Sequence, residues 1–206
     1  MGLYEYLLNT FGQNEPILFR EIKYQDYSQA WLCKELNKLC ADKQLIRYEK
    51  GVYYIPKKTP LGLIPLNPRK VIEKKYISDG EKTIGYYSGM TLFNQLGLST
   101  QMPNILELFT NQETSKVRET LVGSQKVVLR KARTEINDQN VAVLSFLELM
   151  NSVPSGYLDE DRRGKVLQYI RQQGISRSDV TKYAPMFPDK AMRTLVESEV
   201  IYDVAP

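Results

Sequence analysis

The segment 28–55 constrains the fold of this chain more than any other, because a clear helical pattern is followed directly by two β-prone runs. Over 28–41 one face of a helix is expected to carry Leu32, Cys33, Leu36, Leu39 and Cys40. The runs 45–48 and 52–55 flank Glu49-Lys50-Gly51, and Gly51 can adopt the left-handed conformation that a short turn needs. The segment therefore predicts a helix followed by a β-hairpin.

Three shorter elements are expected ahead of this helix. The spacing of the apolar residues in 3–8 predicts a helix that ends at Phe11-Gly12. The run 15–18 can form only a short edge strand, because Pro16 has no N–H to donate, and 19–22 fits one helical turn. Helix, strand, turn, helix and hairpin in this order predict a winged helix-turn-helix DNA-binding domain over residues 1–58.

A second domain is expected over residues 59–206. The stretch 56–62 contains two prolines, two lysines and a glycine, so we expect it to lie outside helices and sheets and to mark the domain boundary. Three runs then predict a small antiparallel sheet at about 105–133: 105–110, 117–122 and 126–133. Helices are predicted before it at 68–76 and 88–96, and after it, within about 140–200, at 141–150, 159–173, 176–183 and 188–199, which makes the fold class α+β.

Several function classes are disfavoured by what the sequence lacks. It has no histidine, the commonest general base and zinc ligand, and its two cysteines lie seven residues apart in one predicted helix, too far for a disulfide. We expect these cysteines to be buried thiols, and we expect no catalytic residue, no metal and no cofactor. A nuclease would need clustered carboxylates, whereas Glu107 is the lone acid of its predicted strand. The chain is therefore predicted to be a non-enzymatic protein, and it is expected in the cytoplasm because no leader or membrane span is evident.

Charge divides unevenly along the chain. Residues 1–133 carry 20 basic and 13 acidic side chains, whereas residues 134–206 carry 8 and 11. This gradient favours an acidic partner such as nucleic acid for the first two thirds.

The candidate DNA-binding residues follow from how a recognition helix docks. Its N-terminal, outward-facing side chains reach base edges in the major groove, and Gln29 can form two hydrogen bonds to an adenine edge. Cations further along the helix, on the hairpin and just beyond it can contact phosphates. The predicted set is Tyr27, Ser28, Gln29, Trp31, Lys34, Lys38, Arg47, Lys50, Lys57 and Lys58.

Each of these features also has a purely structural interpretation. Lys34 and Lys38 can form a solvated helix face, and winged helices also dock on proteins. Trp31 on the polar side needs a partner, and packing within the chain is favoured over a nucleic-acid backbone. The cations of the predicted sheet form either a basic surface or a soluble sheet edge: Lys116, Arg118, Lys126, Arg130, Lys131 and Arg133.

Several motifs together resemble the AbiE-type antitoxin family, the AbiEi-like regulators of bacterial phage-defence and toxin-antitoxin operons. They are Leu36-x-x-Leu39, the block 45–56, Gly85-Tyr86-Tyr87-Ser88-Gly89, Leu96-Gly97-Leu98 and Gln101-x-Pro103-Asn104, which together span most of residues 1–133. The resemblance implies a winged-helix repressor that acts on inverted repeats in its own promoter, and a second domain that counters a toxin of nucleotidyltransferase type. Two positions depart from the family pattern: Asp42-Lys43-Gln44 stands where relatives often have glycine, and Glu49 stands where the hairpin tip is commonly basic or small.

The first hypothesis is therefore an antitoxin and autorepressor that binds double-stranded DNA as two copies across an inverted repeat. The alternative is an ordinary winged-helix regulator with a ligand-sensing or dimerisation domain and no toxin partner.

Overall fold

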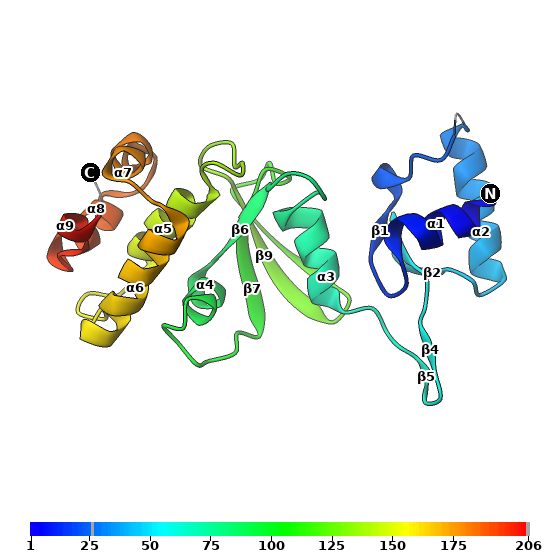
Figure 1. The fold of residues 1–206 in the computed structure, drawn as a ribbon, viewed down its shortest axis with the longest axis horizontal. Coiled ribbons are helices and arrows are strands. Elements are labelled where there is room, and N and C mark those ends of the chain that lie inside the picture. The colour runs from blue at the N-terminus through cyan, green and yellow to red at the C-terminus, as the bar shows by residue number, and fades with distance from the viewer. Residues whose placement is uncertain (26, 205–206) are drawn as a thin grey trace. The chain divides into compact units, whose positions relative to one another are not determined.

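A computed structural model describes residues 1–25 and 27–204 and divides the chain into two compact units (Figure 1). The first unit comprises Met1–Lys75 together with Val122–Ser124, and the second comprises Tyr76–Leu121 and the residues from Gln125 onward. The expected boundary between residues 58 and 59 lies inside the first unit. The expected α+β class is confirmed, because both helices and sheets are present.

The first unit begins with the elements predicted for it, in the predicted order. They are α1 (Leu3–Phe11), β1 (Ile17–Leu18), a 3-10 turn (Phe19–Glu21), α2 (Gln29–Ala41), β2 (Ile46–Glu49) and β3 (Val52–Tyr54). The strands form an antiparallel sheet in the order β1-β3-β2, in which Tyr53 pairs with both Ile17 and Arg47. Leu7 of α1, Leu36 of α2 and Ile17 are fully buried in one apolar core, which explains why the two helices lie against this sheet.

The segment 56–62 corrects the sequence prediction, because part of it is sheet. β4 (Lys58–Thr59) pairs antiparallel with β5 (Gly62–Leu63) in a two-stranded hairpin. Thr59 Oγ1 donates a 2.8 Å hydrogen bond to the Gly62 carbonyl, and Ile64 N donates to the Lys57 carbonyl at 3.0 Å. The prolines do not prevent this pairing, because Pro60 lies in the turn between the strands and not at a paired position.

After the hairpin the chain forms α3 (Pro68–Ile72) and a π-helical turn (Glu73–Ile77), in the region predicted as one helix over 68–76. Asn67 caps α3, and its side-chain oxygen accepts a hydrogen bond from Arg69 N at 3.0 Å.

The sheet of the second unit has four strands where three were expected. They are β6 (Gly85–Ser88), β7 (Ile105–Thr110), β8 (Val117–Val122) and β9 (Gln125–Lys131), in the order β6-β7-β9-β8. β6 pairs antiparallel with β7, but β7 pairs parallel with β9. Val127 and Leu129 bury β9 in the sheet interior, whereas the exposed, charged Arg118 and Glu119 keep β8 at the edge.

Gly85 allows β6 to join this sheet. A Cβ atom at this position would lie 2.0 Å from the Tyr76 carbonyl oxygen and 2.7 Å from that of Phe109, so only glycine fits. Ser88, predicted as a helix cap, does stand before α4 (Gly89–Gln95), but its hydroxyl makes no capping hydrogen bond.

The remaining helices pack around one central helix, α5 (Val141–Ser152), whose residues 143–150 are all buried. They are α6 (Glu160–Gln173), α7 (Arg177–Tyr183), a 3-10 turn (Ala184–Met186), α8 (Asp189–Glu197) and α9 (Val200–Asp203). The predicted capping box at Ser176 and Asp179 is confirmed, because each backbone N–H donates to the other side chain, at 3.0 and 3.1 Å. Within the described part of the chain, no helix has the length and apolar character needed to cross a membrane.

Candidate nucleic-acid interface

The outward face of α2 presents the polar side chains that sequence analysis selected. Leu32 and Leu36 face the core, so Lys34 and Lys38, two residues further along in each case, point to solvent and are exposed. Gln29 is exposed in the first turn. The Ser28 hydroxyl caps the helix by accepting a 3.3 Å hydrogen bond from Trp31 N. The start of α2 is thereby fixed with its exposed polar side chains in one row.

An aromatic stack fixes the approach to α2. The Trp31 and Tyr27 rings are stacked, with centroids 3.9 Å apart and an interplanar angle of 15°. Tyr24 continues the stack, with its centroid 5.7 Å from that of Tyr27 and 6.0 Å from that of Trp31. The expectation that Trp31 packs within the chain is confirmed. Tyr27 still exposes 45% of its surface, so one side of the stack remains open to a partner.

The hairpin formed by β2 and β3 adds Arg47 and Lys50, both exposed. Its one acidic residue, Glu49, forms an ion pair with Lys75 at 2.5 Å. This pairing offsets the negative charge that set the hairpin tip apart from the family pattern.

Two further acids of this unit are neutralised in the same way, by lysines that follow α3 or belong to it. Lys74 pairs with Glu21 at 2.9 Å, and Lys70 pairs with Glu15. By contrast, among residues 1–25 and 27–204 no ion pair involves any of the six cations predicted to contact DNA: Lys34, Lys38, Arg47, Lys50, Lys57 and Lys58. Their charge is therefore available to an anionic partner.

The two cysteines of α2 correct the expectation of buried thiols. Cys33 is exposed and Cys40 is partly buried, because position 33 lies on the flank of the helix and not on its core face. Burial raises the pKa of the Cys40 thiol above its ordinary value, and the nearby Arg47 acts in the opposite direction. Cys40 is thus protonated at neutral pH and leaves the positive charge of Arg47 uncompensated.

The basic residues of the second unit's sheet are more fully paired. Arg118 binds Glu113, Arg130 binds Glu107 and Arg133 binds Glu148. Half of the six cations considered there are therefore engaged in holding the fold, which favours the structural interpretation for this region. Lys116, Lys126 and Lys131 are exposed.

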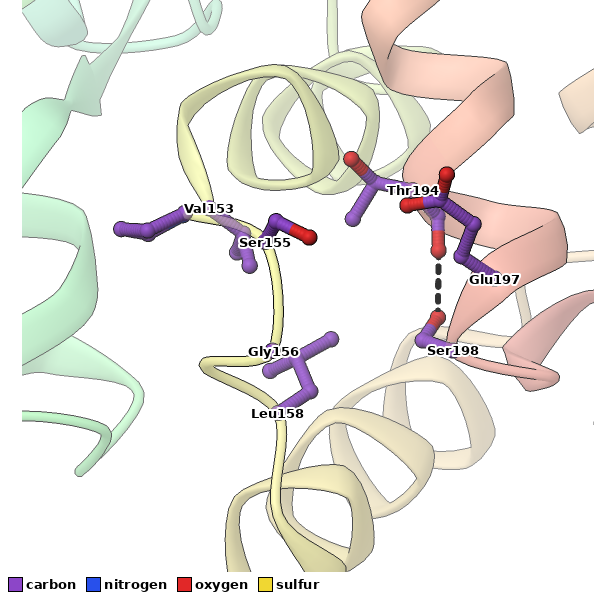
Figure 2. A pocket seen from close by; sticks show the side chains of 8 residues that line it. Val153, Ser155, Gly156, Leu158, Thr194, Glu197 and Ser198 are labelled. Atoms are coloured by element: carbon purple, nitrogen blue, oxygen red, sulfur yellow. Dashed lines mark hydrogen bonds between the residues drawn. The ribbon is translucent and has the colours of Figure 1, made fainter.

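A pocket of about 290 Å³ lies in the second unit between the α5–α6 loop and α8 (Figure 2). Val153, Leu158 and Thr194 line it, and Glu197 is its one ionisable side chain. The Ser198 hydroxyl donates to the Thr194 carbonyl at 2.7 Å, so it is already engaged. No acid-base pair or activated nucleophile lines this pocket.

Comparison with known proteins gives a family but no activity. The model of one family, described as a family of unknown function (DUF6088), matches residues 12–175, about four fifths of the chain. No curated protein matches the chain.

Proposed function

The chain belongs to DUF6088, and we propose that it is a DNA-binding transcriptional regulator whose first unit acts as a winged helix-turn-helix. In this proposal α2 is the recognition helix and the β2–β3 hairpin is the wing. The order of α1, β1, the 3-10 turn, α2 and the hairpin supports this assignment, as does the packing of both helices on one sheet.

The observation that carries the proposal is the segregation of charge in the first unit. Glu15, Glu21 and Glu49 are neutralised by lysines within the unit. Lys34 and Lys38 on α2 and Arg47 on the hairpin remain exposed and form no ion pair within the described ranges. A helix with its free cations along one face, followed by a basic hairpin, suits a polyanion with grooves, and the major groove, about 12 Å wide, admits one α-helix.

Within this interface the side chains take different roles. Gln29, in the first turn of α2, is the best placed residue to read an adenine edge, and Lys34 reaches guanine or a phosphate. Because the Ser28 hydroxyl caps α2, its main contribution is to hold the helix start. The remaining cations, including Lys57 and Lys58, contact phosphates, which position the protein without reading sequence.

The direct test is binding of the full-length protein to a fluorescent duplex that covers the promoter of its own gene. K34A/K38A is expected to bind at least about tenfold more weakly than the wild type, since two contacts of about 1 kcal/mol each are lost. K190A/R193A is the matched control, because both residues are exposed on α8 and the substitution removes the same net charge. Equal weakening in both variants, or none in K34A/K38A, would refute the assignment of α2.

We further propose, on the resemblance to AbiE-type antitoxins, that the protein binds an inverted repeat as two copies and counters a toxin of nucleotidyltransferase type. The test is growth of cells that express the neighbouring gene with the wild type or with K34A/K38A. Relief of toxicity by both proteins would support an antitoxin activity separate from DNA binding. An absence of toxicity, or no relief by the wild type, would favour the alternative of a regulator without a toxin.

A further inference from the structure

The β4–β5 hairpin has an apolar tip that the fold leaves without a partner. Leu61 in its turn is fully exposed, at 100%, and Leu63 exposes 52% of its surface. Pro60 beside them is also exposed. Fully exposed leucines at the tip of an ordered hairpin do not stabilise a fold, so this tip is available for an intermolecular contact.

The hairpin is an ordered element and not a loose connection. Its strands pair at Lys58–Leu63 and Thr59–Gly62, and the Thr59 hydroxyl closes the turn on the Gly62 carbonyl at 2.8 Å. Gly62 adopts a φ of +116°, which an L side chain rarely reaches. Figure 1 shows the hairpin extending away from the three-stranded sheet of the same unit. A rigid, projecting tip can enter a narrow site.

Charge at the base of the hairpin selects the kind of partner. Lys57 and Lys58 immediately precede the tip and are exposed, and no ion pair involves them within the described ranges. They are also continuous in sequence with β3, the second strand of the proposed wing. A polyanion bound by the wing would therefore meet these lysines next, with the leucine tip beyond them.

The chemistry of the tip distinguishes between the grooves of DNA. Pro60, Leu61 and Gly62 carry no side-chain donor or acceptor, so they cannot read the hydrogen-bond pattern of the major groove. Proteins that insert apolar side chains such as proline or leucine between base pairs do so from the minor groove, with cations beside them.

We propose that the β4–β5 hairpin is a second DNA-contacting element, which places Leu61 in the minor groove as a wedge against a base step and so distorts the duplex. This inference rests on the proposed DNA binding by α2. It assigns a role to 57–63 that differs from groove reading, because this segment would alter DNA shape and favour sites with easily unstacked pyrimidine–purine steps.

The test measures affinity and duplex distortion together, using the full-length protein and the promoter duplex with 2-aminopurine placed at successive TA and CA steps. L61S is expected to bind about tenfold more weakly and to lose the fluorescence increase that reports unstacking. L121S is the matched control, because Leu121 is likewise exposed, at 61%, on strand β8, and should behave as the wild type. Since Leu61 touches no core, L61S should unfold at the same urea concentration as the wild type.

The outcomes separate this inference from the function on which it rests. If the wild type binds and L61S binds and distorts the duplex to the same extent, the tip does not enter DNA and the inference is overturned, while the proposed function stands. If the wild type binds neither this duplex nor a random one at low salt, both are overturned.

Discussion

At the scale of single residues, the end of α2 shows how one side chain can strain a fold. Lys43 adopts a φ of +56°, the left-handed region that costs a non-glycine residue about 1 kcal/mol or more. It lies within Asp42-Lys43-Gln44, where the AbiE-type pattern often has glycine. The structure gives the physical reason for that preference, because the turn from helix to strand needs a left-handed residue here.

Lys43→Gly is therefore expected to raise the free energy of unfolding by about 0.5 kcal/mol, after the greater chain entropy of glycine offsets part of the relieved strain. Trp31 is the single tryptophan of the chain, so urea unfolding followed by its fluorescence reports on the first unit. Lys38→Gly is the contrasting control, since glycine inside a helix should cost about 1 kcal/mol. A loss of stability in K43G would show that the strain is absent.

The candidate site was predicted from sequence mainly because helical periodicity is local. The exposure of Gln29, Lys34 and Lys38 follows from the positions of Leu32 and Leu36 alone. The pairing of Glu49 with Lys75 could not be predicted, because the partners lie 26 positions apart and no local pattern links them. Cys33 was predicted wrongly because it borders the apolar face, where periodicity does not resolve burial.

At the scale of elements, β8 is held by a buried carboxylate. Glu113 is 5% exposed, accepts hydrogen bonds from Ser115 N and Thr114 N at 2.9 and 3.1 Å, and is paired with Arg118 at 2.5 Å. Burial alone would raise the pKa of Glu113, but the hydrogen bonds from Arg118 and the two backbone groups hold this pKa below its ordinary value of 4.5.

A depressed folded-state pKa means that Glu113 stabilises the fold fully above about pH 4.5, and that this stabilisation is lost as the pH falls through the folded-state pKa. E113Q should therefore have a lower urea midpoint than the wild type at pH 7, and the difference should shrink at pH 3. Near-UV circular dichroism can follow the transition. E119Q, on the exposed edge of the same strand, should show no such pH-dependent difference, and a gap for E113Q that stays constant with pH would contradict this account.

Elements were predicted well where their signal is local and poorly where it is not. The capping box at Ser176 and the order of elements in the first unit needed only neighbouring residues. The parallel pairing of β7 with β9 depends on which strand of the β8–β9 hairpin is more apolar, which is a property of the assembled sheet. The β4–β5 hairpin was missed because two prolines suggested a linker, although Pro60 occupies a turn position that tolerates it.

At the scale of the whole molecule, the second unit is joined across its layers by Arg133. Its guanidinium donates to Glu148 of α5 at 3.2 and 3.3 Å. It also lies over the rings of Phe109 and Phe187, 5.4 and 4.9 Å from their centroids. One side chain thus connects the sheet, the central helix and the segment before α8.

Arg133→Met is expected to destabilise the second unit by about 3 kcal/mol or more, because it leaves the 7%-exposed Glu148 carboxylate without its cation. R130M is the matched control, since the Glu107 partner of Arg130 is 35% exposed and that pair should contribute less than about 1 kcal/mol. Calorimetric unfolding of both variants distinguishes the two. Restoration of stability in R133M/E148L would confirm that the unpaired charge is the cause, and equal losses in R133M and R130M would argue against it.

The central claim, that the first unit binds DNA through the free cations of α2, is tested most directly by the salt dependence of binding. The observed association constant of the wild type for the promoter duplex should fall steeply between 50 and 200 mM salt. In K34A/K38A the slope of log K against log salt should be shallower by about 1.8 for each bound copy, because about 0.9 counterions are released per phosphate contact. A nearly flat wild-type dependence, or the same slope in both proteins, would contradict the account.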